Sequence, residues 1–493
     1  MVWQTKLKQM TGYDHFKPGQ AETLAVLEKG QNALAILPTG GGKSLIYQLY
    51  QYQAPGITVI VSPLISLMQD QVGQLQTMGL GPGIALNSTY EKKQQAYILH
   101  HLDRYKFVFI SPEMLLKQEV RSKLKTMPIH LLVVDEAHCI SQWGFDFRPE
   151  YTELKAVRQF LGNPLTLALS ATASSETLQD IQTYLFEPEE QAVLIKESVD
   201  RPNIFYVFEE LGHTNERETK LLEWLAELPK PGIVYVHHKS ELEALTKFVK
   251  AQTEFQVASY HGDRTLADRH IIQNQFINGR LDVVFATSAF GMGINHPNIR
   301  FVLHYHLPKN IADFVQEIGR AGRDQDQAVA VVLYDQSERA RLQQIRRVYE
   351  EEADLLESLL GPLFDGRLTV EMLDRYSDSI AAMLRFYKHH FRNLTEAKAH
   401  AQKLRQTKMQ QIYQMLDLMN HDGCYRELLL HHADETLEKK PDLCCTHCNS
   451  DFRTHASWLE FMHLPKVLQF LQEHAPNETN KFAWRTRLDE LFS

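Results

Sequence analysis

Short, continuous apolar runs alternate with helix-favouring stretches from about residue 20 to residue 335 of this 493-residue chain. The runs form two series: ITVIVSP (57–63), FVFISP (107–112), LLVVDE (131–136) and LTLALSAT (165–172), then GIVYVH (232–237), FQVASYHG (255–262), DVVFAT (282–287), IRFVLHYHLP (299–308) and AVAVVLYD (328–335). Continuous apolar runs are typical of parallel strands that are buried on both faces. The two series predict two doubly wound α/β domains, with ligands at the carboxyl ends of the strands and between the domains.

The chain is too long for one hydrophobic core, since single cores stop growing at roughly 250–300 residues. Its pattern changes after Asp335: residues 336–420 are charged and helix-favouring, and four of the five cysteines follow in a short window. We predict four parts. They are a first parallel-sheet domain over 1–205, a second over 206–335, a helical region with a cysteine module over 336–450, and a short helical tail over 451–493.

The composition, with 44% hydrophobic and 23% charged residues, is typical of a soluble protein. No stretch supplies the ~18 or more apolar residues that a membrane span needs. The polar segment Met1 to Met10 lacks the apolar core of a signal peptide. We therefore expect a cytosolic protein that does not bind membranes. The net charge of −9 argues against a protein that coats nucleic acid, but a local basic channel would still hold phosphates.

LPTGGGKS (37–44) lies between an apolar run and a helical stretch, which is the context of a P-loop. Glycines turn backbone N–H groups toward phosphates, and the helix N-terminus adds partial positive charge. The predicted ATP ligands are Thr39, Gly40, Gly41, Gly42, Lys43 and Ser44, with Ser44 also a ligand of Mg²⁺. Leu37 stands where the strict pattern has glycine, so a simple glycine turn after a strand is the alternative.

VVDEAH (133–138) ends a predicted strand with two adjacent carboxylates. Asp135 is predicted to hold Mg²⁺, and Glu136 to orient and deprotonate the attacking water. The alternative is an ordinary acidic pair at a helix N-terminus. GRAGR (319–323) supplies Arg320 and Arg323, which would stabilise charge on the transferring phosphoryl group from the second domain. Their alternative is a surface salt-bridge pair. Together the three motifs predict a nucleotide hydrolase.

These motifs resemble superfamily 2 helicases, and specifically the RecQ family of DNA helicases, whose two α/β domains are RecA-like. The resemblance covers roughly residues 10 to 450. GYDHFKPGQ (12–20) resembles the family's adenine-binding motif, which implies that Tyr13 stacks on the base and that Lys17 and Gln20 bind the nucleotide. Other matching segments are SPLISLMQDQ (62–71), SATAS (170–174), RPN (201–203), YHGDR (260–264), ATSAFGMGIN (286–295) and QEIGRAGRD (316–324).

DEAHCISQWGFDFRPEY (135–151) resembles the family's aromatic-rich loop, which couples single-stranded DNA to ATP hydrolysis. The resemblance implies DNA contacts by Trp143, Phe145, Phe147 and Arg148, since bases stack on aromatic faces for ~1–3 kcal/mol each. The alternative is that these aromatic side chains belong to the core. Glycine, aspartate and proline within the segment favour a loop.

The cysteine window resembles the family's zinc domain, through Cys424-Tyr-Arg426 and Cys445-Thr-His-Cys448. Thiolates at this spacing can ligate one tetrahedral Zn²⁺. Cys444 is the candidate fourth ligand, but neighbouring side chains tend to diverge, so His447, His431 or Asp442 are alternatives. Free buried thiols are the alternative to zinc. The pairs His389-His390 and His431-His432 are interpreted as ordinary surface residues.

The resemblance implies an ATP-dependent helicase that moves 3′→5′ on single-stranded DNA and unwinds duplexes in recombination and repair. Its cofactors would be ATP, Mg²⁺ and Zn²⁺. Its partners would be single-stranded, tailed or forked DNA and a single-stranded-DNA-binding protein. We expect a cytoplasmic monomer, associated with the nucleoid if bacterial.

The spacing of the motifs suggests a short form of the family. About a hundred residues separate Arg323 from Cys424, which suggests a helical insertion, and 45 residues follow Cys448. These are too few for the family's winged helix and further helical accessory domain. The rival functions are an RNA helicase, a DNA translocase that does not separate strands, and a DNA-binding scaffold with a decayed ATPase.

Overall fold

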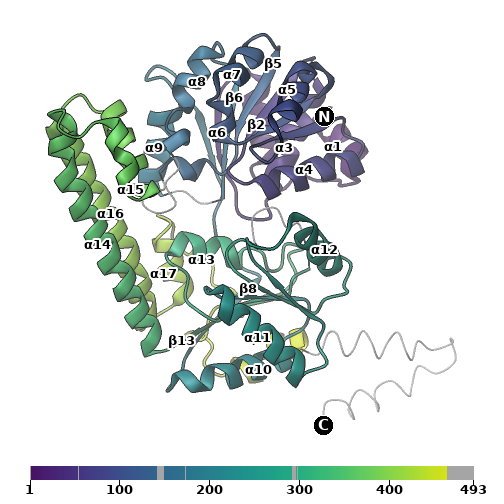
Figure 1. Cartoon of the computed structure of the whole chain (residues 1–493). Coiled ribbons are helices and arrows are strands. Elements are labelled where there is room, and N and C mark those ends of the chain that lie inside the picture. The colour runs from purple at the N-terminus through teal and green to yellow at the C-terminus, as the bar shows by residue number, and fades with distance from the viewer. Residues whose placement is uncertain are drawn as a thin grey trace.

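The computed structural model describes residues 2–53, 55–141, 149–171, 174–290, 296 and 298–462, which form two α/β domains and a helical arm beside them (Figure 1). The first domain has a sheet of seven parallel strands in the order β3-β4-β2-β5-β6-β1-β7. The strands are β1 (Ala33–Ile36), β2 (Ile57–Val61), β3 (Gly83–Leu86), β4 (Phe107–Ile110), β5 (Ile129–Val134), β6 (Thr166–Ser170) and β7 (Val193–Lys196). The helices are α1 (Val2–Thr11), α2 (Gln20–Glu28), α3 (Lys43–Tyr50), α4 (Ile65–Thr77), α5 (Lys92–His100), α6 (Pro112–Leu115), α7 (Gln118–Lys125), α8 (Leu154–Phe160) and α9 (Ser175–Leu185).

The second domain has a sheet of six parallel strands in the order β10-β11-β9-β12-β13-β8. The strands are β8 (Ile204–Glu210), β9 (Gly232–Tyr235), β10 (Val257–Tyr260), β11 (Val283–Ala286), β12 (Phe301–His304) and β13 (Ala328–Tyr334). The helices are α10 (Arg217–Glu227), α11 (Lys239–Gln252), α12 (Leu266–Ile277) and α13 (Ile311–Ile318).

Each sheet is buried on both faces, which explains the continuous apolar runs in the sequence. In β5, for example, Leu132 and Val134 belong to one core cluster, whereas Leu131 and Val133 belong to another on the opposite face. The second sheet separates two core clusters in the same way. The prediction of two doubly wound parallel-sheet domains is confirmed.

The sequence pattern did not identify three strands, and all three lie at sheet edges. They are β3 and β7, at the two edges of the first sheet, and β8, at one edge of the second. An edge strand has one strand neighbour instead of two. Because β3 and β8 are nevertheless mostly buried, exposure accounts for a weaker apolar signal only in β7. Only Ile195 of the four residues of β7 is buried.

The region predicted to be helical, residues 336–420, forms an arm of three helices: α14 (Gln336–Phe364), α15 (Asp378–His390) and α16 (Leu394–Asn420). Figure 1 shows α14 and α16 side by side along the two domains, with α15 beside α9 of the first. The carboxyl-terminal end of α16 packs into the second domain. Its residues Ile412, Met415, Leu418 and Met419 belong to a core cluster of that domain. None of the described helices, including the long arm helices, has the length and apolarity to cross a membrane.

The cysteine module, which includes α17 (Tyr425–His431), extends the open edge of the second sheet. Cys445 forms a parallel β-bridge with Tyr206 of β8, and the N–H of Thr446 donates to the Tyr206 carbonyl at 2.9 Å. After the module, Phe452 and Trp458 pack against Phe205 and Trp224 of the second domain. The tail predicted for 451–493 therefore begins as part of this core, and its residues beyond 462 lie outside the described ranges.

Candidate nucleotide site at the domain junction

The predicted P-loop joins β1 to α3 at the carboxyl end of the first sheet. Gly40 and Gly42 have φ angles of 85° and 71°, in the left-handed region that favours glycine. Gly42 directly precedes α3, so the free amides of that helix's first turn begin at the loop. Lys43 donates a long hydrogen bond of 3.4 Å to the Leu37 carbonyl. A helix N-terminus and an ammonium group at one glycine loop form a site for a phosphate chain.

The three predicted nucleotide ligands of the adenine-binding motif, Tyr13, Lys17 and Gln20, differ in their burial and in their contacts with this loop. Gln20 is buried, and its amide donates to two carbonyls of the glycine loop, both at 3.0 Å. Its carbonyl accepts from the backbone N–H of Lys17 at 2.9 Å, and the Lys17 ammonium donates to the Gly40 carbonyl at 2.8 Å. Tyr13 is 65% exposed, so its ring face is accessible to a base. Gln20 thus supports the glycine loop directly.

The two candidate carboxylates follow β5, which is separated from the P-loop strand β1 by one strand, β6. Asp135 is held by its backbone N–H, which donates to the Val61 carbonyl at 2.9 Å. Glu136 has a left-handed φ of 49°, and its buried Oε2 lies 3.4 Å from His138 Nδ1 with no hydrogen-bond partner among the described residues. Burial raises the pKa of Asp135, and the neighbouring Glu136 charge raises it further. A cation between the two carboxylates and a phosphate would remove this penalty.

GRAGR follows α13 of the second domain and lies directly against the P-loop of the first. A Cβ added to Gly40 would lie 2.9 Å from Cγ of Arg323, and one added to Gly319 would lie 3.0 Å from Cβ of Thr39. Arg320 is buried beside Tyr235, whose pKa burial raises and Arg320 lowers. The junction between the domains therefore brings a guanidinium of one domain to the glycine loop of the other.

This junction is rich in positive charge. Burial, together with the charges of Arg320 and Arg201, lowers the pKa of Arg323 to about 9. Burial also lowers the pKa of Lys17, and Arg201 and Arg323 add to that shift. Cations that lower one another's pKa are stabilised by a bound anion. The arrangement favours a polyanion such as a nucleotide polyphosphate.

Arg201 and Arg426 belong to the segments RPN (201–203) and Cys424-Tyr-Arg426, whose resemblance to the family implied no role for either arginine. Arg201 donates to the carbonyls of Thr39 (3.3 Å), Gly319 (3.0 Å), Ala321 (2.9 Å) and Gly322 (2.6 Å). Arg426, fully buried in the cysteine module, donates to the Asp200 carboxylate and to the carbonyls of Arg201 and Ile204. The cysteine module thus fixes the interdomain linker, and the linker fixes the backbone that carries Arg320 and Arg323.

We expect Arg201→Lys to lower kcat for ATP by about 10²-fold, the loss that a displacement of ~1 Å in a positioned group can cause. A lysine ammonium cannot span four carbonyls as the guanidinium fork does. KM should change less, because three of the four carbonyls that Arg201 holds belong to GRAGR and only that of Thr39 belongs to the P-loop. Steady-state ATPase kinetics measure the changes in kcat and KM separately.

Arg158→Lys is the matched control for this prediction. Arg158 is as deeply buried and also donates to a backbone carbonyl, that of Leu185 at 2.8 Å, but far from the junction. It should lose thermal stability with kcat unchanged. Equal kcat losses in both variants would show that Arg201 acts only through general stability.

The four clustered cysteines converge on one point. The sulfurs of Cys424, Cys444, Cys445 and Cys448 all lie within 4.8 Å of one another, and those of Cys424 and Cys444 are 3.5 Å apart. A tetrahedral site with Zn–S bonds of about 2.3 Å separates its sulfurs by about 3.8 Å. The residues therefore fit zinc, and Cys444 joins the cluster although it is adjacent to Cys445. The chain turns immediately after Cys445, where the N–H of Asn449 donates to the Cys445 carbonyl at 2.9 Å.

The predicted DNA loop, with Trp143, Phe145, Phe147 and Arg148, lies outside the described residues. Its amino-terminal flank is anchored: His138 Nδ1 lies 3.0 Å from Ser170 Oγ, in the segment SATAS. Ser141 donates to Asp180 at 2.7 Å. The DNA contacts of the loop remain a prediction.

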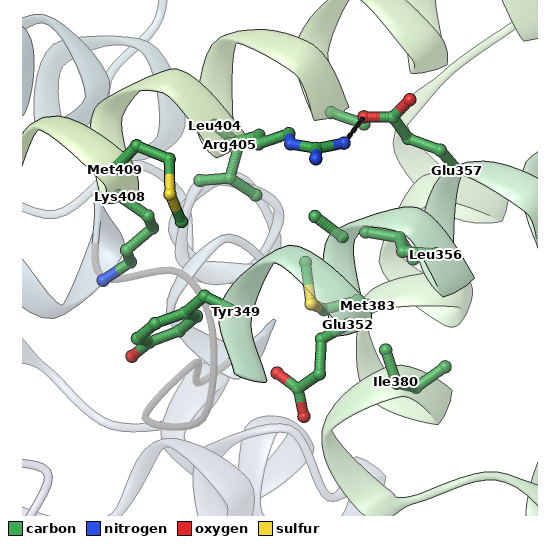
Figure 2. Close-up of a pocket in the computed structure, with 12 residues that line it drawn as sticks. Tyr349, Glu352, Leu356, Glu357, Ile380, Met383, Leu404, Arg405, Lys408 and Met409 are labelled. Atoms are coloured by element: carbon green, nitrogen blue, oxygen red, sulfur yellow. Dashed lines mark ion pairs between the residues drawn. The ribbon is translucent and has the colours of Figure 1, made fainter. Parts of the chain in front are cut away.

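A separate small hollow of about 40 Å³ lies within the arm, between α14, α15 and α16 (Figure 2). Its walls are mainly apolar, and an ion pair of 3.7 Å between Arg405 and Glu357 lies at its side. Burial raises the pKa of Glu352 in its wall. None of the described residues that line the hollow is predicted to bind ATP, so we treat it as part of the packing of the arm.

Comparison with known proteins identifies two helicase domain families in this chain. A DEAD/DEAH box helicase model matches residues 17–181, and a helicase conserved C-terminal domain model matches residues 216–325. The probable ATP-dependent DNA helicase RecS of Bacillus subtilis is 39% identical over 460 residues, which is 91% of this chain and 92% of that protein. The ATP-dependent DNA helicase RecQ of Haemophilus influenzae is 39% identical over 341 residues, which is 69% of this chain and 54% of that protein.

Solved structures support the fold. Helicase Lhr of Mycobacterium smegmatis, bound to single-stranded DNA and AMP-PNP, matches with a TM-score of 0.58 at 19% identity, over 85% of this chain and 57% of that one. Mss116p, bound to single-stranded RNA and AMP-PNP, matches with a TM-score of 0.58 at 15% identity, over 82% of this chain and 94% of that one.

Proposed function

The chain belongs to the family of RecQ and RecS ATP-dependent DNA helicases, and we propose that it hydrolyses ATP at the junction of its two RecA-like domains to move 3′→5′ along single-stranded DNA. The chain spans nearly all of its RecS relative but about half of its RecQ relative. The polarity and a role in recombination and repair rest on the family resemblance.

The contact between GRAGR and the P-loop is the observation that carries this proposal, with Arg323 Cγ 2.9 Å from the position of a Cβ on Gly40. Lys43 and the first turn of α3 would hold the phosphates, and Arg320 and Arg323 would neutralise charge that develops in the transition state. Glu136 would take the proton of the attacking water. Mg²⁺, held by Ser44 and Asp135, would neutralise the phosphate oxygens.

Because the arginines and the P-loop belong to different domains, a change in domain separation would change the hydrolysis site. The proposed DNA loop follows directly from the carboxylate motif, only seven residues beyond Glu136 at Trp143. Single-stranded DNA bound there would act on Glu136 through a short stretch of backbone. This proximity supports a coupled motor over a scaffold with a decayed ATPase.

Strand displacement tests the polarity. We expect a duplex with a 3′ single-stranded tail to be unwound well, and duplexes with a 5′ tail or blunt ends poorly. Binding of DNA should weaken steeply as salt is raised, because contacts of basic side chains with phosphates release counterions. Trp143→Ala should lower DNA-stimulated hydrolysis more than basal hydrolysis.

A preference for 5′ tails would contradict the polarity. DNA-stimulated hydrolysis without strand separation on any substrate would identify a translocase. Equal unwinding of an RNA duplex would support the RNA helicase instead.

The four cysteines are proposed to hold one structural zinc ion. We expect one tightly bound zinc per chain, and we expect Cys448→Ser to weaken zinc binding by more than about 100-fold, since loss of even an outer-sphere partner costs 10–100-fold. Elemental analysis and melting temperature measure the effect. Cys139→Ser is the control, because Cys139 is also buried but lies in the first domain, away from the cluster. Wild-type protein without zinc would contradict the proposal.

A further inference from the structure

The tip of the arm meets the first domain at a small polar cluster. Glu153, the residue before α8, lies against His389 and His390, the last two residues of α15. Its Oε1 is 3.1 Å from His390 Nε2, and its Oε2 is 3.7 Å from His389 Nε2. The two histidines, which the sequence suggested were ordinary surface residues, therefore converge on one carboxylate from another domain.

Packing fixes the orientation of this cluster. The ring of His390 lies 4.6 Å from Phe386 on the same helix and 6.3 Å from Tyr184 on α9, edge to face. The hydroxyl of Thr152 lies 3.4 Å from His390 Nε2. His390 and Glu153 are half-buried, whereas the His389 side chain is 68% exposed. The ligand atoms of His390 and Glu153 are thus held in place by packing, and the exposed side chain of His389 can turn toward them from the solvent side.

The three ligand atoms have the spacing of a metal site. All lie within 4.8 Å of one another. In a tetrahedral zinc site with bonds of about 2.0–2.1 Å to nitrogen and oxygen, ligand atoms lie about 3.3–3.4 Å apart. The separations of 3.1 and 3.7 Å in this cluster fall on either side of that value. A ring nitrogen that faces a carboxylate oxygen needs a proton or a cation between them. One metal ion could take this place for both histidine rings, bound by both ring nitrogens and by the carboxylate.

We propose that Glu153, His389 and His390 form a second divalent-metal site that fastens the arm to the first domain. Two imidazoles and a carboxylate favour Zn²⁺ or a similar transition-metal ion over Mg²⁺ or Ca²⁺, which prefer oxygen ligands. Water would complete the coordination, so the site binds more weakly than the four cysteines.

The position of the site gives it a structural consequence. The arm is rooted in the second domain through α16, so a metal ion at its tip links both domains by a route separate from the linker at 197–203. Other contacts between the arm and the first domain include the ring packing of Phe386 against Tyr184, an ion pair of Lys403 with Glu176 at 3.0 Å, and hydrogen bonds of Thr407 to the same carboxylate. The surface-exposed ion pair contributes little by itself.

The test titrates Co²⁺ and Zn²⁺ into the full-length protein, with its cysteine module already loaded with zinc, after removal of weakly bound metal. We expect one additional equivalent, with a cobalt spectrum that lacks the charge-transfer absorption of thiolate ligands. His390→Ala and His389→Ala should weaken this binding at least tenfold. Glu153→Gln should do the same while it preserves the size of the side chain and a hydrogen bond to His390.

The control is His100→Ala with His101→Ala, because these adjacent histidines also lie at the end of a helix, α5, but belong to no metal-ligand cluster among the described residues. The control should keep the additional equivalent. The proposal is overturned if the wild-type protein takes up no metal beyond the cysteine module. It is also overturned if Glu153→Gln and His390→Ala, with normal cysteine-bound zinc as proof of folding, bind the additional ion as tightly as wild type.

Discussion

Replacing Lys43 with alanine is expected to abolish ATP hydrolysis, with a fall in kcat of at least ~10³-fold, the lower end of what one guanidinium contributes to phosphoryl transfer. The Lys43 ammonium is the cation that the first residue of α3 places at the glycine loop. The cations on the other side of the junction, Arg320 and Arg323, cannot replace it because they come from the second domain. Phosphate release in steady state, with and without single-stranded DNA, measures the loss.

The fold should survive this change. Lys43 donates one long hydrogen bond of 3.4 Å, to the Leu37 carbonyl, so its removal leaves the packing of β1 and α3 intact. The control is Lys29→Ala, which removes an exposed lysine at the end of α2 in the same domain and should hydrolyse ATP normally. Normal turnover by Lys43→Ala would mean that the active site lies elsewhere.

Glu136→Gln is expected to bind ATP with nearly normal affinity and to hydrolyse it about 10²–10⁴-fold more slowly, the range that a positioned general base contributes. An amide has the size of the carboxylate but cannot accept the proton of water. Because Glu136 Oε2 is buried and has no hydrogen-bond partner in the described part of the chain, the neutral amide should also leave the fold at least as stable. Equilibrium binding of a fluorescent ATP analogue and single-turnover hydrolysis separate the two effects.

The control for the base is Glu119→Gln, which changes an exposed carboxylate in α7 and should have no effect on either step. If Glu136→Gln lost ATP binding as completely as hydrolysis, Glu136 would contribute to the nucleotide pocket and not to the chemistry. If it turned over normally, another group would be the base.

The sequence by itself determined the interior of the fold and the local parts of the site. Strands such as β2 and β5 are identifiable because neighbouring strands on both sides and helices on both faces favour apolar residues at nearly every position. The P-loop and the carboxylate pair are short contiguous segments, so their backbone geometry depends mainly on nearby residues such as Gly42. The cysteine spacing likewise predicted a cluster of thiols, which the structure places within 4.8 Å of one another.

Only the tertiary structure decided which distant residues meet. Nothing in the spacing of GRAGR shows that Arg323 lies against Gly40, or that Arg201 holds the motif's carbonyls, because these contacts depend on how two separate cores dock. The edge strand β8 became clear only through its pairing with β13 and with the cysteine module.

The same reason applies to side-chain direction. Adjacent residues tend to diverge, so the sequence left the role of Cys444 open and suggested no role for His389 and His390. A turn after Cys445 and the packing of α15 on the first domain bring each pair to a common point. The local sequence pattern indicates which residues are buried and which backbone conformations they favour. Whether side chains meet at one point depends on contacts between elements that are far apart in the chain.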